Sequence, residues 1–450
     1  MTKQQRLVIL VSILASFVAF LDGSVINVAL PSISKDIGGG LGTQQWVVDA
    51  YLITLGSLML IAGSFSDIFG RKKILAWGLT GFGLASLICA VSPTPELLIA
   101  SRALQGVAGA LLIPSSLALI ISAFKGAAQS KAIGTWTAWT GISFIIGPLL
   151  GGLLVDAGSW RLIFAINVLP IALTLWLLTR LQLRDNPHSG IKLDIGGAVL
   201  CGLGLGASVF ALIEQPAHGW THPMIYLPLI AGIGMLALFL YIERTVKAPM
   251  LPLGLFSIRN FAIGNLATLM IYAGISLATF VIAIFVQQVG NYSAIEAGLA
   301  LIPITLIMFF LSSRFGALAG RYGPRLFMAL GPIVGAVGFF TMLFVDAHVS
   351  YWALLPGVVI FGLGLSITVA PLTSAILGSV DESQAGIGSA VNNAVARIAG
   401  LVAIAAIGPV IGASLDLDGF HVSIFVTAAL LFVGGVISAL GITNKQLQQQ

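Results

Sequence analysis

A few charged side chains lie deep inside long apolar segments of this chain. Asp22 is nine residues before Pro31, and Arg102 is seven residues after Pro95. If both segments are membrane-spanning helices, these residues lie roughly 13 Å and roughly 10 Å below the same membrane surface. Placing a charged side chain at that depth in a bilayer costs several kcal/mol of free energy, so each residue is a candidate for function.

The matching depths predict that Asp22 and Arg102 pair across an internal cavity. Burial disfavours a charged carboxylate, whereas a neighbouring guanidinium favours it. A carboxylate held between these opposing effects can take up and release a proton as the cavity opens and closes. The alternative is a static structural ion pair.

Two more polar residues lie in apolar segments: Gln105 is in the same segment as Arg102, and Asp49 is in a different one. Asp49 lies three positions after Trp46, near the expected outer end of its helix. It is either a second protonatable group or a solvated residue at a helix start. Gln105 shares one helical face with Arg102, because residues three positions apart are neighbours on a helix, and it is a candidate for the substrate cavity.

A second polar face is expected in the C-terminal part of the chain. Arg397 is about 18 Å into its apolar segment at helical rise, and Ser389, Asn393 and Gly400 share its helical face. The face should line the interior of a helix bundle. It serves either as a substrate contact, through Asn393 and Arg397, or as a packing surface between helices.

These residues must be positioned by membrane-spanning helices. Of the 450 residues, 58% are hydrophobic and 8% are charged, whereas a soluble domain has about 25% charged residues. The surplus apolar surface must face lipid, which cannot hydrogen-bond the backbone, so the spanning elements are helices or a closed barrel. Apolar runs of about 20 residues or more predict helices.

Run lengths and helix-breaking residues predict fourteen spans. The first, which Pro31 is expected to end, is too long for the core of a signal peptide. The spans are expected near 6–30, 45–69, 73–92, 95–124, 130–156, 161–181, 193–214, 223–243, 258–289, 294–318, 323–345, 350–378, 385–413 and 420–442.

The distribution of basic residues supports this count. Of the 21 Lys and Arg residues, only Lys35 and Arg161 fall in expected outer loops, and only Arg102 and Arg397 fall within spans. Since cytoplasmic loops collect basic residues, both termini are expected in the cytoplasm and the chain in the cell membrane. The net charge of +5 forms no stripe, so nucleic acid is not an expected partner.

An internal repeat divides the fourteen spans. Residues 63–72 align with residues 316–325, with glycine at the first and eighth positions and a basic residue at the tenth. The copies are eight spans apart and have the same orientation, as in a parallel repeat of two six-helix bundles. We expect bundles at 1–190 and 251–450, with two extra helices linking them at 191–250.

The fifth expected span is rich in glycine. It contains Pro148, which removes one backbone hydrogen bond, and glycines that allow another helix to approach closely. This helix is therefore expected to bend or rock. The glycines are Gly141, Gly147, Gly151 and Gly152.

Taken together, these motifs resemble the drug/proton antiporters of the major facilitator superfamily, in the branch with fourteen spans. The resemblance covers nearly the whole chain. It rests on residues 21–31 (LDGSVINVALP), 46–51 (WVVDAY), 63–73, 102–109, 147–152 (GPLLGG), 288–298 and 391–397 (VNNAVAR).

The resemblance implies roles for several residues. Asp22 would be the titrating group, and Arg102 would assist proton movement. Residues 147–152 would form a motif associated with exporters. A cytoplasmic gate between the bundles would be formed by Gly63, Asp67, Gly70, Arg71 and Lys72.

One departure concerns the substrate. Relatives that export lipophilic cations often carry acidic residues in later spans, but no Asp or Glu lies in the middle of the last six expected spans. Cation export is therefore in doubt. The substrate is expected to be neutral, weakly basic or anionic, with Arg397 as a possible anion contact.

The sequence therefore predicts an all-α, proton-coupled exporter of lipophilic small molecules that works by alternating access, as a monomer, without cofactor or metal. A symporter or uniporter of a small metabolite on the same fold is the first alternative. A channel would need a pore loop or charged ring, and a receptor a sizeable soluble domain. An enzyme would need clustered reactive groups, whereas all five histidines lie in loops or at helix ends.

Overall fold

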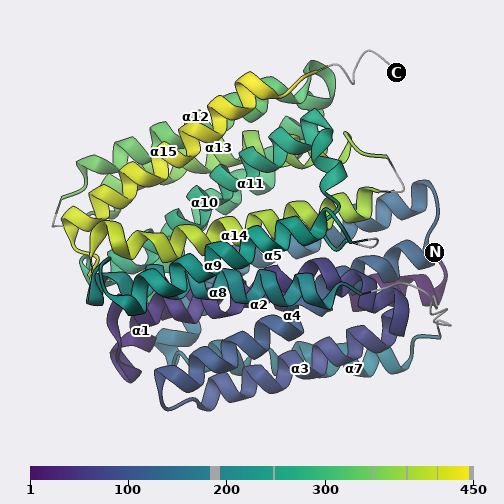
Figure 1. Cartoon of the computed structure of the whole chain (residues 1–450), viewed down its shortest axis with the longest axis horizontal. Coiled ribbons are helices and arrows are strands. Elements are labelled where there is room, and N and C mark those ends of the chain that lie inside the picture. The colour runs from purple at the N-terminus through teal and green to yellow at the C-terminus, as the bar shows by residue number, and fades with distance from the viewer. Residues whose placement is uncertain (183–192, 247–248, 347–348, 382–383, 413, 445–450) are drawn as a thin grey trace. The chain divides into compact units, whose positions relative to one another are not determined.

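The computed structural model describes residues 1–182, 193–246, 249–346, 349–381, 384–412 and 414–444, and they form an all-helical protein (Figure 1). Within these ranges, fourteen helical segments are long and apolar enough to cross a membrane. The prediction of an all-α membrane protein with fourteen spans is confirmed.

The first compact unit comprises Met1–Ser208 and Ile230–Met250. Its sixth span is broken into two helices, α6 and α7, by a short turn that contains Asn167. The helices are α1 (Lys3–Ile37), α2 (Gly40–Phe69), α3 (Arg71–Val91), α4 (Pro95–Ala123), α5 (Ala127–Ala157), α6 (Leu162–Ala165) and α7 (Val168–Thr179), together with parts of α8 (Ile195–His218) and α9 (Pro223–Glu243).

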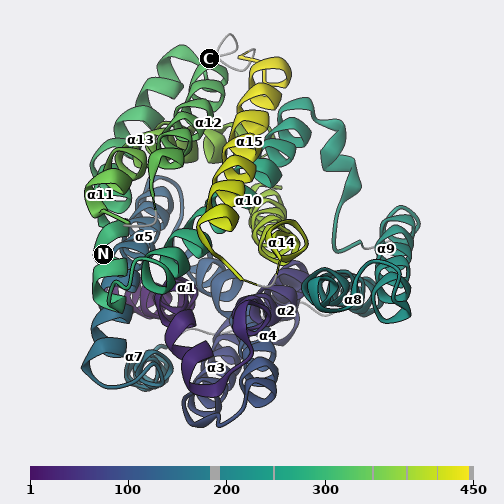
Figure 2. The ribbon, with the colours of Figure 1, turned by 90° about the vertical axis from the view of Figure 1, so that its left-hand side faces the viewer.

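The second unit comprises Val209–Leu229 and Leu251–Gln450. In Figure 2, α15 of this unit is seen close to α10 and α12, and these helices are in contact. The complete helices of this unit are η1 (Leu253–Ser257), α10 (Arg259–Gln288), α11 (Ala294–Tyr322), α12 (Pro324–Thr341), η2 (Met342–Phe344), α13 (Tyr351–Leu377), α14 (Ala385–Ile411) and α15 (Leu417–Gly441).

Helix packing repeats between the two units. In the first, α1 packs on α5, α2 and α3 pack on α4, and α7 packs on α1 and α3. In the second, α10 packs on α14, α11 and α12 pack on α13, and α15 packs on α10 and α12. Both units therefore have the same order of packing, as a parallel repeat requires.

The aligned glycines of the repeat have the same backbone conformation. Gly70 joins α2 to α3 with φ of 96°, and Gly323 joins α11 to α12 with φ of 89°. A positive φ of this kind is readily adopted by glycine and costs other residues energy. The shared glycine thus makes a one-residue connection between two antiparallel helices in each unit.

The extra helices α8 and α9 approach each other through glycine. A Cβ at Gly204 of α8 would lie 2.9 Å from Leu236 Cγ and 3.1 Å from the carbonyl oxygen of Gly232, both in α9. Close glycine contacts of this kind are common between membrane helices. The division into bundles at 1–190 and 251–450 with linking helices at 191–250 stays a prediction.

The prediction that Pro31 ends the first helix is wrong. Helix α1 continues through Pro31 to Ile37 and ends at Gly38, whose backbone N–H donates to the Ser34 carbonyl oxygen at 3.0 Å. A proline removes only one backbone bond, whereas ending a helix leaves several groups unsatisfied. In lipid the second cost is larger, so the helix continues.

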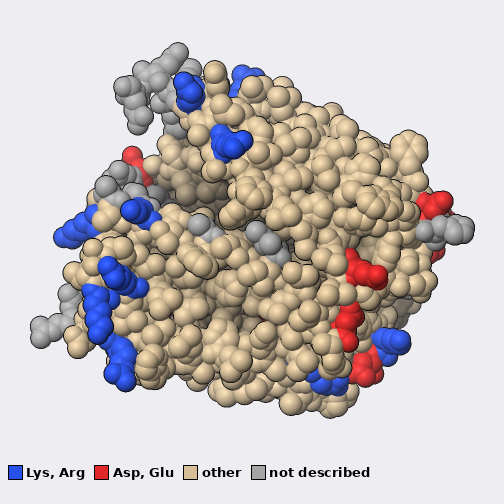
Figure 3. Space-filling view, turned by 180° about the vertical axis from the view of Figure 1, so that it is seen from behind, with Lys and Arg blue, Asp and Glu red and all other residues tan. Residues whose placement is uncertain are grey.

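Charged side chains lie mainly at the ends of the helices. On the face shown in Figure 3, most Lys and Arg side chains lie toward one set of helix ends, and most Asp and Glu side chains lie toward the opposite set. The surface between them carries almost no charge in this view. A band of this kind is what lipid contact requires.

Candidate functional site

The structure brings Asp22 of α1 and Arg102 of α4 into direct contact. The Nη1 atom of Arg102 donates to Oδ2 of Asp22 at 2.5 Å, and both side chains are 1% exposed. The described residues that hydrogen-bond to this pair, Val47, Gln105 and Asn167, belong to the first unit. The sequence suggested that the two residues pair across an internal cavity. In the structure both side chains are instead packed among helices.

Two amide side chains occupy the other oxygen of the Asp22 carboxylate. Its Oδ1 atom accepts from Nε2 of Gln105 at 2.8 Å and from Nδ2 of Asn167 at 3.0 Å. The Ser86 hydroxyl oxygen of α3 also accepts from Gln105, at 2.8 Å. Asp22 thus receives three N–H donors, an arrangement that suits an ionised carboxylate, which only accepts.

Arg102 is held by groups other than its partner. Its Nε atom donates to the carbonyl oxygen of Val47 in α2 at 3.0 Å, and Nη1 also donates to Oε1 of Gln105 at 2.6 Å. The guanidinium lies over the ring of Tyr51, 4.4 Å from its centroid. Arg102 would therefore keep a defined position if Asp22 were neutralised.

Asn167 and Ser86 also belong to this site and were not predicted from the sequence. Asn167 lies in the turn between α6 and α7 and is fully buried. The available signal was an amide within an otherwise apolar span, which usually marks an interhelical contact. Ser86 offered no comparable signal, because small hydroxyl residues are common in membrane helices. Gln105, expected at the substrate cavity, is instead fully buried in this network.

Asp49 is fully buried well inside α2, which begins at Gly40. The idea that Asp49 is a solvated residue at a helix start is therefore wrong. The reason is that α2 begins before the expected position. Neither carboxylate oxygen has a hydrogen-bond partner among the described residues. A buried carboxylate without hydrogen bonds is costly when charged, which favours a protonated form.

The residues expected to form a cytoplasmic gate surround the connection between α2 and α3. Gly70 makes this connection, and Gly63 has open space where a side chain would begin. Arg71 begins α3, and the Nζ atom of Lys72 donates to the carbonyl oxygen of Leu181 at 2.8 Å. The side chain of Asp67 lies outside the described part of the structure. A role for this region as a gate stays a prediction.

Helix α5 is continuous through Pro148 and packs closely on α1. A Cβ at Gly151 would lie 2.6 Å from Val25 Cγ2 and 2.7 Å from Val28 Cγ2. Gly147 approaches Ser24, whereas a Cβ at Gly141 would have no described neighbour within 4 Å. Gly152 is buried.

The polar face expected on α14 is divided in the structure. Asn393 donates to the carbonyl oxygen of Ser389 in its own helix at 2.9 Å, and Arg397 lies close enough to Tyr272 of α10 for an electrostatic interaction. The neighbouring Asn392 makes hydrogen bonds from α14 to α10. Its Nδ2 atom donates to Oγ1 of Thr268 at 2.9 Å and to Oδ1 of Asn265 at 3.2 Å, both in α10.

Comparisons with known proteins agree with this architecture. Residues 12–404 match the family model of the Major Facilitator Superfamily. The chain is 31% identical to the Methylenomycin A resistance protein of Streptomyces coelicolor, covering 94% of this chain and 89% of that protein. It is 34% identical to the Puromycin resistance protein pur8 of Streptomyces alboniger, covering 89% and 81% respectively.

Solved structures show the same fold at low sequence identity. A peptide transporter POT in complex with alafosfalin superposes with a TM-score of 0.73 at 14% identity, covering 98% of each chain. A D-xylose-proton symporter gives a TM-score of 0.69, also at 14% identity and 98% coverage of each chain. From the family match and the extent of these similarities, this chain belongs to the major facilitator superfamily.

Proposed function

We propose that this protein is a proton-coupled efflux transporter that exports lipophilic drugs or related small molecules by alternating access, and that it is not an enzyme. The observation that carries the proposal is the Asp22–Arg102 pair, buried in membrane-spanning helices with three N–H donors on one carboxylate. A buried ionisable group in a transporter commonly marks a proton pathway.

The proposed coupling step is proton transfer to Asp22. A proton bound to Oδ2 would remove the charge attraction to Arg102 and leave an O–H facing an N–H donor. Because Val47, Gln105 and Tyr51 still hold Arg102, the carboxyl group and α1 would be the parts that move. Asp49 is proposed as a second protonatable group in the same unit.

The export direction is supported by relatives and by the contact between α1 and α5. The similar proteins are resistance proteins for methylenomycin A and puromycin, and resistance in a transporter family is consistent with removal of an antibiotic from the cell. Gly147 and Pro148 belong to the motif associated with exporters, and Gly147 contacts α1 two residues after Asp22. This motif supports an exporter over a symporter or uniporter on the same fold.

The substrate is proposed to be lipophilic, and its charge follows from the second unit. The last six spans carry no Asp or Glu in their middle parts, and the half-buried Arg397 and Asn393 are the proposed substrate contacts there. A neutral, weakly basic or anionic compound fits these groups better than a permanent cation.

The proposed orientation places both termini in the cytoplasm of a multi-pass cell-membrane protein that works as a monomer. It puts the connection of α2 to α3, with its gate residues, on the cytoplasmic side. The excess of Lys and Arg at one set of helix ends supports this orientation.

The available energy limits the possible exchange. An inward proton releases about 2.3 kcal/mol at 100 mV and about 1.4 kcal/mol for one pH unit. The sum supports a gradient of a few hundred-fold for a neutral solute. Exchange of one proton for one monovalent cation moves no net charge, so only the pH difference drives it and supports a cation gradient of about tenfold. A larger cation gradient would need more protons.

Transport into proteoliposomes tests this proposal. Vesicles that contain the purified protein receive a pH gradient, and puromycin uptake is compared with uptake of tetraphenylphosphonium, a permanent cation. We expect puromycin to accumulate against its gradient only while protons flow in the opposite direction. Puromycin movement in the same direction as protons would instead indicate a symporter, and equal movement without a gradient would indicate a uniporter.

A further inference from the structure

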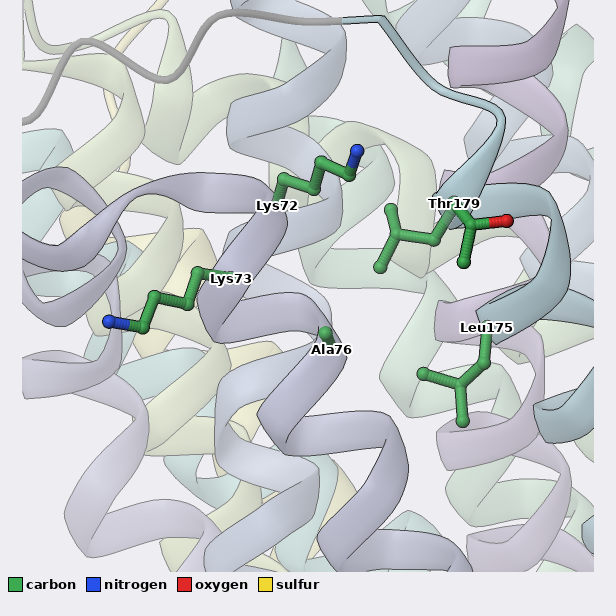
Figure 4. Close-up of a pocket in the computed structure, with 6 residues that line it drawn as sticks. Lys72, Lys73, Ala76, Leu175 and Thr179 are labelled. Carbon is green, nitrogen blue, oxygen red and sulfur yellow. The ribbon is translucent and has the colours of Figure 1, made fainter.

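A groove lies between the beginning of α3 and the end of α7 (Figure 4). It has a volume of about 560 Å³ and is lined by Lys72, Lys73 and Ala76 of α3, and by Leu175, Leu178 and Thr179 of α7. Figure 4 shows Ala76 and Leu175 on facing sides of the groove. All these residues belong to the first unit, and none belongs to the proposed proton site.

The two walls of the groove have the same pattern of cation and aromatic ring. The Lys73 ammonium lies over the ring of Trp77 at 4.8 Å, and the Arg180 guanidinium lies over the ring of Trp176 at 5.2 Å. Both tryptophans are about half exposed. Each lies four residues, or about one helical turn, further into the membrane than its cation.

This pattern indicates the depth at which the groove lies in a bilayer. Tryptophan is enriched where the hydrocarbon meets the headgroups, and lysine and arginine reach from there toward water. The cations of α3 and α7 therefore lie at the level of lipid phosphates. Ala76 and Leu175 lie within one residue of the two tryptophans, at the boundary where acyl chains begin, and the buried Leu178 lies between Trp176 and Arg180.

The chemistry of the groove is therefore that of a lipid, charged at one end and apolar along its length. Lys72 and Lys73 line its polar end, Arg180 follows α7 directly at the same end, and none of the described residues that line the groove is acidic. In Figure 4 the Lys73 ammonium points away from α7. Lys72 also joins the two walls, since its Nζ atom donates to the Leu181 carbonyl oxygen just after α7. Basic pockets between membrane helices commonly hold anionic headgroups.

We propose that this groove is a binding site for one anionic phospholipid, of the phosphatidylglycerol type. Its phosphate lies among Lys72, Lys73 and Arg180, and one acyl chain follows the apolar wall between α3 and α7. Lys73 and Arg180 are exposed and long enough to turn from their tryptophans toward the phosphate. The bound lipid would hold the ends of α3 and α7 together.

Native mass spectrometry of the purified full-length protein tests the site directly. Phosphatidylglycerol and phosphatidylcholine with identical acyl chains are titrated onto the wild type and two charge variants. Lys73→Gln/Arg180→Gln removes both exposed cations at the groove. Lys125→Gln/Lys131→Gln removes two exposed lysines, one between α4 and α5 and one near the start of α5, and is the matched control.

We expect one phosphatidylglycerol to bind the wild type and the control more tightly than phosphatidylcholine. Each cation contributes about fivefold near a membrane surface, so the groove variant should lose roughly 20- to 30-fold in affinity. Equal binding of the two lipids, or equal losses in the groove variant and the control, would overturn the proposal. Transport is not measured, so this result is independent of the proposed function.

A third variant tests the acyl-chain wall, and a soluble competitor tests the source of the phosphate. Ala76→Leu keeps every charge but fills the groove, and we expect it to weaken phosphatidylglycerol binding while Lys125→Gln/Lys131→Gln does not. Glycerol 3-phosphate, which has no acyl chains, should not displace the lipid. Displacement at equal concentration would show a site for soluble phosphates and refute the lipid assignment.

Discussion

At the scale of single residues, the Asp22–Arg102 pair is a costly feature that the fold retains. Removing two charges from water costs several kcal/mol per ion, and good geometry is needed to offset that cost. Here the geometry is supplied by Gln105, Asn167 and the Val47 carbonyl group. Such a pair contributes little net stability, which agrees with a role in proton coupling better than with a purely structural role.

Comparing single and double substitutions of Asp22 and Arg102 should separate the stability lost with the ion pair from the stability lost with side-chain packing. Arg102→Gln leaves a buried carboxylate without its partner, and we expect a loss of about 3 to 5 kcal/mol in stability. Asp22→Asn/Arg102→Gln removes both charges and should recover part of that loss. Thermal unfolding of the purified single and double variants measures this coupling. Additive effects of the two substitutions would contradict a paired role.

Asp49 should behave differently, because the described residues offer its carboxylate no hydrogen bond. Asp49→Asn keeps the shape but removes the ionisable group, so we expect an unchanged or higher melting temperature. If Asp49 carries a proton during transport, the same variant should lose about tenfold or more in proton-driven uptake, equivalent to about 1.4 kcal/mol. A clear loss of stability with normal uptake would assign Asp49 a structural role.

At the scale of elements, the contact of α1 with α5 connects Asp22, the proposed proton site, to the helix that we expect to bend or rock. Asp22 and the residues that face Gly147 and Gly151 lie on the same stretch of α1. The absence of side chains at these two glycines of α5 allows its backbone to approach Ser24 and Val25. A shift of α1 after proton binding would therefore change the packing at this interface first.

A larger residue at this interface should disturb both packing and transport. Gly151→Val places a branched side chain against Val25 and Val28 of α1, and overpacking of this kind costs about 1 to 3 kcal/mol. Gly141→Ala is the control, since no described atom lies within 4 Å of the added carbon. Melting temperature and uptake should fall in the first variant alone. Equal behaviour of both variants would show that the α1–α5 contact is not tight.

Some elements could not be predicted from local sequence. The proline rule placed the end of the first helix at Pro31, but the cost of exposing backbone groups to lipid extends α1 to Ile37. The break between α6 and α7 was also missed, because residues 161–181 are apolar almost throughout. Hydropathy detects the presence of a span and does not detect a turn within it.

At the scale of the whole molecule, apolar run lengths and the spacing of Gly70 and Gly323 were sufficient to predict the fold. Both signals can be read directly from the sequence and survive errors in helix boundaries. The Asp22–Arg102 contact was predictable because depth in a membrane can be counted along each helix. Asn167 and Ser86 were not, since separate helices bring them to Asp22 and no sequence spacing records that convergence.

We propose that Asp22 carries the proton that drives export. The most direct test is substrate-driven proton movement in proteoliposomes containing the wild type or Asp22→Asn, with puromycin counterflow as the control for folded, active protein. Asp22→Asn/Arg102→Gln serves as a second variant if the single substitution is unstable. We predict that these variants retain counterflow but release no protons when puromycin is added and show no response to an imposed pH gradient. Proton movement equal to that of the wild type in Asp22→Asn would contradict the account.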